Sequence, residues 1–328
     1  MSSDELIQGV RAGDRRWLAK AITLVESARP EHQTQAAALL DGILDTPRRA
    51  VRLGVSGAPG AGKSSLIECL GMQLVESGTR VAVLAVDPSS QVSGGSILGD
   101  KTRMERLGVH PMAFIRPSPA RGSLGGVATH TREAMLLCEA AGYDVVVVET
   151  VGVGQSEATV ADLVDFCAVL IPPGAGDALQ GMKRGLIELA DALLINKVDV
   201  DSEAAARTAR DYSQALELLG VKDDGWAPQV LQISAHTGQG VDTLWQQVQA
   251  QRHVLGADGL EQRRLRQAVR WFHAQLEQGL WRALRGDPTL HAELRALEQA
   301  VLQGQMHPDR AARKLIAHML APRHEPAG

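Results

Sequence analysis

The feature that most constrains this chain is a glycine-rich segment that follows a short apolar run. The run is Val51–Val55, and the segment reads Gly57-Ala58-Pro59-Gly60-Ala61-Gly62-Lys63-Ser64-Ser65. It is the G-x-x-x-x-G-K-S pattern, set between a predicted strand and a predicted helix. Glycines let backbone N–H groups turn toward phosphates, and the helix N-terminus adds its positive dipole. We therefore predict that Gly57–Ser65 binds nucleotide phosphates, with Lys63 at the β- and γ-phosphates and the Ser64 hydroxyl on Mg²⁺.

Further apolar runs of strand length alternate with helical stretches between about Arg49 and Val254. These runs are Val81–Val86, Ala113–Ile115, Val145–Val148, Cys167–Ile171, Ala192–Ile195 and Val230–Ile233. Continuous apolar runs are typical of strands that are covered on both faces, and hence of parallel sheets. The pattern predicts an α/β P-loop NTPase domain with a mainly parallel central sheet flanked by helices.

Both ends of the chain are predicted to be helical. Residues 1–48 carry apolar side chains at helical spacing, and we expect two or three short helices that pack against the main domain. Near the other end Leu265, Val269, Phe272 and Leu276 repeat at helical spacing. We therefore divide the chain into an N-terminal helical extension (1–48), a P-loop domain (49–254) and a C-terminal helical extension (255–328).

A second motif indicates which base the nucleotide carries. The predicted strand Ala192–Ile195 ends in Asn196-Lys197-Val198-Asp199, an N-K-x-D sequence. A carboxylate accepts from both guanine N1–H and N2–H₂, which adenine does not offer, so Asp199 is the candidate for guanine. Lys197 would lay its aliphatic stem on the purine, and Asn196 would tie its loop to the phosphate loop. The next strand ends in Ser234-Ala235-His236, whose backbone N–H groups are candidates for guanine O6.

Carboxylates at other strand ends are candidates for the magnesium sphere. Glu149 and Gly152 form an E-x-x-G sequence after a buried run, where the carboxylate would face Mg²⁺ and the glycine N–H would sense the γ-phosphate. Asp87 ends another strand, at the edge where open α/β sheets bind ligands. Asp100 follows in a glycine-rich stretch, and for it a helix N-cap is an alternative reading. The predicted catalytic positions are Lys63, Glu149 and Gly152.

Two segments have the character of switch loops. Val153–Glu157, which includes Gln155, is short and polar and follows the E-x-x-G sequence. Pro172–Gly185 is longer than an ordinary loop between a strand and a helix, and it carries Asp177, Gln180 and Lys183. It reads either as a loop with a helix start or as a further nucleotide-responsive segment.

Composition excludes some classes of function. The formal net charge of -4 gives no electrostatic case for binding nucleic acid or an anionic membrane. The three cysteines lie far apart in apolar contexts, as expected for buried thiols in a reducing compartment. The N-terminus has neither a basic nor an apolar segment of the secretory kind, and no apolar run reaches the roughly 20 residues of a membrane span. We expect a cytoplasmic protein.

Taken together, these strings resemble the MeaB-type GTPases, the chaperones associated with methylmalonyl-CoA mutase. The resemblance rests on GAPGAGKSS, VDPSS, GGSILGDKTRM, ETVGVGQSE, PPGAGDALQGMKRG, NKVD and SAHTG, in this order between about Gly54 and Gly240. It implies the P-loop class that contains signal-recognition and metal-insertion GTPases (SIMIBI). It also implies binding of GTP/GDP with Mg²⁺, a homodimer built by the C-terminal helices, and an adenosylcobalamin-dependent acyl-CoA mutase as partner.

The same resemblance assigns roles to the segments described above. GTP binding and hydrolysis would gate cofactor delivery to the mutase and protect it from damaged cofactor. Asp87, Asp100 and Glu149 would match the carboxylates around Mg²⁺, and Gly174–Gly185 would match a third switch that reports nucleotide state to the mutase. The mitochondrial members carry a transit peptide, and its absence here suggests a bacterial protein.

Two other functions stay open at the level of sequence. A metal-insertion GTPase of the nickel-chaperone kind shares the fold class, but such proteins usually show clusters of Cys and His that we do not find in this sequence. A small-molecule or protein kinase is the second alternative. The N-K-x-D sequence favours guanine over this reading, and no acceptor site is recognisable.

Overall fold

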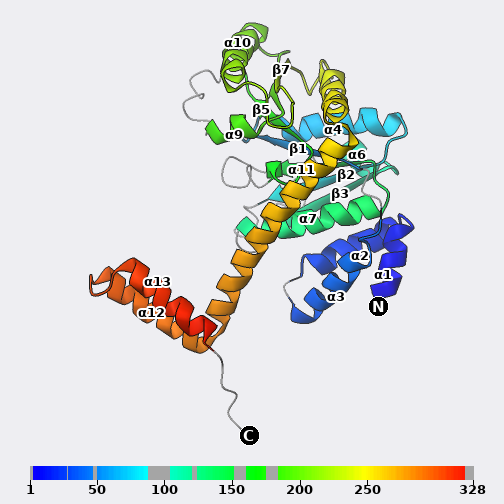
Figure 1. Ribbon diagram of the computed structural model, residues 1–328. Helices are drawn as coiled ribbons and strands as arrows, with labels where there is room; N and C mark the ends of the chain where they lie inside the picture. The colour runs from blue at the N-terminus through cyan, green and yellow to red at the C-terminus, as the bar shows by residue number, and fades with distance from the viewer. Residues whose placement is uncertain are drawn as a thin grey trace. The chain divides into compact units, whose positions relative to one another are not determined.

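The computed structural model describes residues 3–27, 29–46, 50–87, 104–119, 124–150, 160–174 and 184–321. The chain forms two compact units, Met1–Leu265 and Arg266–Gly328. The first unit contains a central sheet with helices on both faces, and the second is helical (Figure 1).

Within the described residues, a seven-stranded parallel sheet has the order β3-β2-β4-β1-β5-β6-β7. Its strands are β1 (Val51–Gly57), β2 (Val81–Asp87), β3 (Ala113–Pro119), β4 (Val145–Thr150), β5 (Phe166–Ile171), β6 (Ala192–Ile195) and β7 (Gln229–Gln232). Strand β1 lies in the middle, between β4 and β5. Because all the strands are parallel, their carboxyl ends meet at one edge, where such sheets bind ligands. The predicted parallel α/β fold is confirmed.

Helices cover both faces of this sheet, and α4 and α7 lie on opposite faces (Figure 1). The helices of the first unit are α1 (Ser3–Arg11), α2 (Arg15–Val25), α3 (Pro30–Asp41), α4 (Lys63–Glu76), α6 (Glu105–Val109), α7 (Leu124–Ala140), α9 (Arg184–Leu189), α10 (Ser202–Leu219) and the first part of α11 (Val241–Gly286). The N-terminal helices pack on the main domain as predicted. Helix α2 contacts α7, and Glu26 at its end pairs with Arg116 of β3.

Side chains of β1 point alternately to the two faces of the sheet, so this strand packs against helices on both faces. Leu53 and Val55 belong to the buried cluster that includes Leu66 and Leu70 of α4. Gly54, between them, points to the other face, where a Cβ would lie 2.9 Å from Cγ2 of Val164. Successive residues of a strand point to opposite faces, so β1 is buried on both sides. Its one charged residue, Arg52, is buried in an ion pair with Glu139 of α7.

A buried ionic network lies at the amino ends of the strands, opposite the edge where their carboxyl ends meet. Asp165 precedes β5 and Asp191 precedes β6, and both side chains are fully buried. Arg264 of α11 donates from Nε to Asp165 at 2.8 Å, and Arg263 donates to Asp191 at 3.0 Å. Helix α11 bends at Gly256, whose φ of 64° and ψ of −178° are not helical. The two arginines therefore attach α11 to the strand starts, away from the nucleotide-binding edge.

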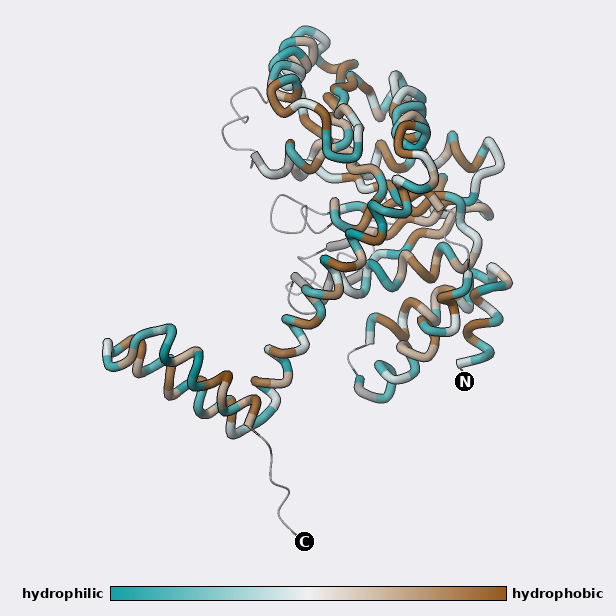
Figure 2. Tube along the Cα trace, viewed as in Figure 1, coloured by the Kyte–Doolittle hydropathy of each residue, from teal (hydrophilic) through white to brown (hydrophobic). Residues whose placement is uncertain are grey.

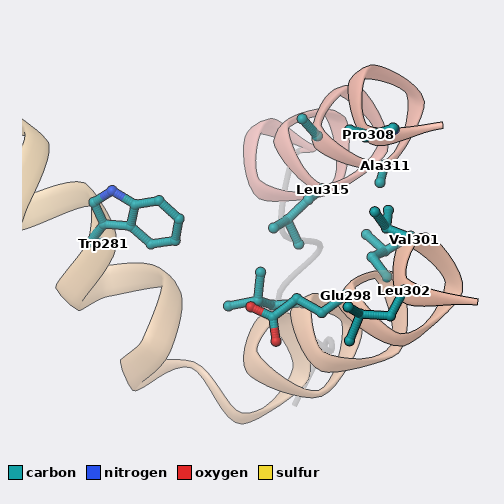
Figure 3. A pocket seen from close by; sticks show the side chains of 10 residues that line it. Trp281, Glu298, Val301, Leu302, Pro308, Ala311 and Leu315 are labelled. Atoms are coloured by element: carbon teal, nitrogen blue, oxygen red, sulfur yellow. The ribbon is translucent and has the colours of Figure 1, made fainter. Parts of the chain in front are cut away.

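The second unit consists of the C-terminal part of α11 with α12 (Pro288–Leu302) and α13 (Pro308–Leu320). Its small core is formed by Leu284, Leu290, Leu297, Ala311 and Leu315. A groove of about 480 Å³ lies among these helices, and its lining is apolar apart from Glu298. Figure 3 shows its lining side chains, with Trp281 of α11 on the far side from Val301 and Leu315.

Apolar and polar residues alternate along the helices, including α11 (Figure 2). In the described parts of the chain, no helix combines the length and the apolar character that crossing a bilayer requires. Continuous apolar sequences lie in the strands instead, such as Val145–Val148 of β4 and Phe166–Ile171 of β5, where every residue is buried.

Gln251 is an unusual residue in the core-facing row of α11. It lies between Val248 and Leu255, it is fully buried, and neither polar atom of its side chain has a hydrogen-bond partner among the described residues. Burying an unpaired amide costs free energy. We predict that Gln251→Met, which keeps the shape of the side chain, raises the free energy of unfolding by about 1–3 kcal/mol. Urea unfolding followed by circular dichroism measures this change.

Gln249 provides the matched control, because it lies on the same helix with its side chain exposed. Gln249→Met should leave the free energy of unfolding unchanged. A loss of stability in Gln251→Met would contradict the prediction, since it would mean that the amide is hydrogen-bonded in the folded chain.

Candidate functional site

The phosphate loop connects β1 to α4 and depends on glycine at two close approaches. Gly57 and Gly62 have φ values of 140° and 96°, in the region that favours glycine. A Cβ on Gly57 would lie 2.5 Å from the carbonyl oxygen of Leu170, and one on Gly62 would lie 2.3 Å from Nδ2 of Asn196. The loop is therefore held tightly against β5 and against the predicted base-recognition loop.

Lys63 is the first residue of α4, and its side chain turns back into the phosphate loop. It is 8% exposed, and its ammonium donates to the carbonyl oxygens of Gly57 at 2.8 Å and Ala58 at 3.1 Å. This places a positive charge at the N-terminus of a helix, where the peptide dipole also favours anions. The arrangement suits a phosphate group more than any neutral ligand.

Ser64 and Glu149 meet beside this loop. Glu149 lies near the end of β4 and is 3% exposed, and its Oε1 accepts from the Ser64 hydroxyl at 2.9 Å. A hydroxyl and a carboxylate are the oxygen ligands that Mg²⁺ prefers, so this pair fits the predicted ion. Asp87 ends β2 at the same edge of the sheet, although its side chain, like all of Asp100, lies outside the described residues.

Asn196 connects three parts of the site. Its Nδ2 donates to the carbonyl oxygen of Ala61 at 2.8 Å, and its Oδ1 accepts from the backbone N–H of Ala235 at 2.9 Å. One buried amide thus ties the phosphate loop to the loop after β7. The sequence predicted the first of these contacts, and the second was not expected from it.

Asp199 is exposed, as a residue that meets a ligand must be. A hydrogen bond from the Ser234 side chain is the main reason that the pKa of Asp199 is lowered. The carboxylate therefore stays ionised to a lower pH than an ordinary aspartate. Lys197, between Asn196 and Asp199, adopts a φ of 65°, a conformation uncommon for a residue other than glycine. This left-handed residue turns the chain sharply after β6.

The backbone N–H groups of Ser234, Ala235 and His236 do not all face the guanine site. Ser234 donates to the carbonyl oxygen of Gln239, and Ala235 donates to Asn196. His236 is the remaining candidate for guanine O6. A pocket of about 340 Å³ lies beside it, and its lining includes Ser65 and Cys69 of α4.

Several predicted positions lie outside the described residues. They are Gly152, Gln155, Asp177, Gln180 and Lys183. Both ends of the Gly174–Gly185 segment are described: Arg184 and Gly185 begin α9, and the N–H of Gly174 donates to the hydroxyl of Thr208 at 3.2 Å. This bond attaches the start of the segment to α10.

Sequence reasoning missed a pair of hydroxyl groups under the site. The hydroxyl of Thr150, which follows Glu149, donates to that of Ser56, which precedes Gly57, at 3.0 Å. Both residues are fully buried. The available signal was a hydroxyl residue at the carboxyl end of each of two apolar strands.

Comparisons with known proteins agree with this geometry. A family model described as methylmalonyl-CoA mutase-associated GTPase MeaB matches residues 18–289. A protein of Caulobacter vibrioides that is named as a GTPase is 55% identical over 315 residues, covering 96% of this chain and 97% of the relative. The mouse protein named methylmalonic aciduria type A homolog, mitochondrial, is 44% identical over 325 residues, covering 95% and 78% respectively.

A solved structure is also similar along most of the chain. The crystal structure of an LAO/AO transport system kinase is 39% identical, with a TM-score of 0.79, and the match covers 97% of this chain and 98% of the other. Its P-loop fold is therefore the fold of this chain.

The guanine contact can be tested at Asp199. Asparagine offers one acceptor and one donor where aspartate offers two acceptors, so its amide would face the N2 amino group of guanine donor to donor. We predict that Asp199→Asn weakens GTP binding by about 10- to 100-fold. Binding of xanthosine triphosphate should improve, because xanthine carries a carbonyl at that position. Titration calorimetry measures both affinities.

Asp201 is the matched control, two residues away. It caps α10 by accepting from the N–H of Ala204, a role that asparagine also fills. Asp201→Asn should therefore remove the same charge without changing GTP affinity. Equal losses of affinity in the two variants would show that charge alone, and not recognition of the base, explains the effect.

Proposed function

This chain belongs to the family of methylmalonyl-CoA mutase-associated GTPases, and we propose that it is a GTP-driven chaperone of an adenosylcobalamin-dependent acyl-CoA mutase. In this proposal GTP binding and hydrolysis gate adenosylcobalamin loading and protect the mutase. The observation that carries it is a site of guanine-nucleotide type in a chain matched by a family model whose description names the mutase. The name of the mouse relative, methylmalonic aciduria type A homolog, supports the same link.

The proposed catalytic apparatus positions GTP and neutralises charge. Backbone N–H groups of the phosphate loop and the Lys63 ammonium would contact the phosphates, and Gly152 would sense the γ-phosphate through its N–H. Ser64 and Glu149 would hold Mg²⁺, with Asp87 and Asp100 in its surroundings. When bound, the ion would supply positive charge to the β- and γ-phosphate oxygens.

Recognition of guanine is assigned to three residues of two loops. Asp199 would accept from N1–H and N2–H₂, Lys197 would cover the purine with its aliphatic stem, and the N–H of His236 would donate to O6. The two hydrogen bonds of Asn196 support this assignment, because they hold both loops and the phosphate loop at fixed separations. A rigid set of donors and acceptors rejects a base that leaves them unpaired.

We assign the response to GTP binding and hydrolysis, and its transmission to the mutase, to the segments that follow β4 and β5. Both strands end beside the phosphate loop, since each pairs with β1. We assign Gln155 of one segment, and Asp177, Gln180 and Lys183 of the other, to the response to nucleotide and to contact with the mutase. Such segments are ordered by γ-phosphate and Mg²⁺ in other GTPases and are released on hydrolysis.

The partner assignment predicts a change in turnover. With methylmalonyl-CoA mutase or isobutyryl-CoA mutase present, we expect kcat for GTP hydrolysis to rise, because the partner completes a site whose described residues include no evident base for water. Steady-state phosphate release with and without each mutase measures this. Asp199→Asn assayed with GTP is the control, and it should show little response at the same GTP concentration.

A recovery experiment decides whether the partner is a cobalamin enzyme at all. The chain, loaded with a non-hydrolysable GTP analogue, should retain such a mutase from the lysate of its native host. If kcat is unchanged by either mutase and no cobalamin enzyme is recovered, the chaperone proposal is wrong while the GTPase assignment stands.

We also propose that the chain is a homodimer formed by its C-terminal unit. The part of α11 that belongs to the second unit carries four apolar side chains along one side, each 48–61% exposed: Val269, Phe272, Leu276 and Leu280. The apolar groove among α11, α12 and α13 belongs to the same unit (Figure 3). Exposed apolar rows of this kind mark association surfaces.

The dimer proposal predicts that Phe272→Glu combined with Leu276→Glu gives a monomer in light scattering after size exclusion, because two buried carboxylates would oppose association. GTP affinity should be retained. Leu218→Glu is the control, since Leu218 is 90% exposed at the end of α10 and lies in the other unit. A double variant with the mass of the unchanged chain would contradict the proposal.

A further inference from the structure

The hydroxyl pair of Ser56 and Thr150 lies where the two central strands leave the sheet. The backbone pairing of β1 with β4 runs from Val51 and Val145 to Val55 and Glu149. Ser56 and Thr150 are the next residues on each strand, and their hydroxyls are 3.0 Å apart. A side-chain bond thus continues the connection at the point where the β1–β4 ladder ends.

This bond lies directly behind the groups that carry the chemistry. Ser56 is followed by Gly57, whose carbonyl oxygen accepts from Lys63, and Thr150 is preceded by Glu149, which accepts from Ser64. Side chains alternate along a strand, so Glu149 points toward α4 while Thr150 points to the other face. The Glu149 carboxylate is therefore hydrogen-bonded to Ser64 on the α4 face of the sheet. On the opposite face, the next residue of its strand, Thr150, is hydrogen-bonded to Ser56 of β1.

The outer neighbours of the two strands do not replace this connection. At this level Ser56 pairs with Val169 of β5, and Thr150 pairs with Val86 of β2. These ladders fix each strand to its outer neighbour, and neither of them joins β1 to β4. Backbone pairing of β1 with β4 ends at Val55 and Glu149, and beyond it the hydroxyl bond joins the two strands where the phosphate loop begins.

We propose that Ser56 and Thr150 are a positioning pair that helps to set the distance between the phosphate loop and Glu149 for Mg²⁺-dependent GTP hydrolysis, an inference that rests on the role proposed above for Glu149 at Mg²⁺. Mg²⁺ demands near-ideal octahedral geometry, so it tolerates displacement of an oxygen ligand poorly. In the proposed function the phosphates rest on backbone N–H groups and on the Lys63 ammonium, whereas the hydroxyls of Ser56 and Thr150 bond to each other behind Glu149. The pair should therefore matter for the ion more than for nucleotide binding as such.

The test compares Thr150→Val, which has the shape of threonine without its hydroxyl, with Thr150→Ser, which keeps the hydroxyl. We expect Thr150→Val to lower kcat by about 10- to 100-fold, as small displacements in an active site do, with little change in KM. Thr150→Ser should recover most of the rate. Ser56→Ala removes the other partner, and the double variant should lose no more than either single variant, because the two hydroxyls act as one unit.

A second readout does not depend on turnover. The rate of release of a fluorescent GDP analogue is measured from the same variants in Mg²⁺ and in EDTA. With wild type, Mg²⁺ should slow release, and in Thr150→Val this slowing should be largely lost while the rates in EDTA agree. Thr131→Val, at a buried threonine of α7, is the control, and it should show the wild-type response to Mg²⁺.

Each outcome decides the proposal. Loss of the Mg²⁺ effect in Thr150→Val and Ser56→Ala, with rescue by Thr150→Ser, supports it. A lower melting temperature with normal kcat and a normal Mg²⁺ effect would overturn it, since that result describes a purely structural bond. If Thr150→Val does not fold, Ser56→Ala decides by the same criteria.

Discussion

Strand β1 is hydrogen-bonded on both sides, to β4 and to β5, and the rest of the site depends on this position. A strand buried in the middle of a parallel sheet has its backbone groups satisfied by its neighbours and no freedom to shift register. The phosphate loop that leaves it at Gly57 therefore starts from a fixed point. Glu149 on β4 is fixed against the same strand, which is why Ser64 and Glu149 meet at 2.9 Å.

The carboxyl ends and the amino ends of the strands carry different features of the molecule. At the carboxyl edge, Asn196 joins the phosphate loop to the loops after β6 and β7 with one amide. At the amino edge, the buried carboxylates of Asp165 and Asp191 are paired with Arg264 and Arg263 of α11. Buried charges of this kind are costly to leave unpaired, so α11 is attached to the strand starts. The chemistry and the attachment of the C-terminal helix do not compete for the same surface.

The sequence predicted well what depends on local pattern. The apolar runs located the strands to within a few residues, because β4 and β5 are buried on both faces and are apolar over Val145–Val148 and over the whole of β5. The phosphate loop and the N-K-x-D sequence were recognisable because backbone geometry restricts the residue types at each position. The start of α11 at Val241 was not foreseen, since its polar surface residues show only a weak pattern.

Contacts between distant residues could not be predicted. Ser56 and Thr150 are 94 positions apart, and Arg264 and Asp165 are 99 apart, so no local pattern connects them. The hydrogen bond of the Ala235 N–H to Asn196, which removes that N–H as a candidate for guanine O6, is also a product of the tertiary fold. Gln251 is buried in the core-facing row of α11, in a position where the helical period alone predicts an apolar residue.

We infer that the strand ends of this sheet form a site for a guanine nucleotide and not for nucleotides in general. The most direct measurement is the affinity of the unaltered chain for GTP and for ATP, by titration calorimetry in Mg²⁺. We expect GTP to bind at least about 100-fold more tightly than ATP, because adenine would leave the Asp199 carboxylate unpaired. Equal affinities for the two nucleotides would contradict it.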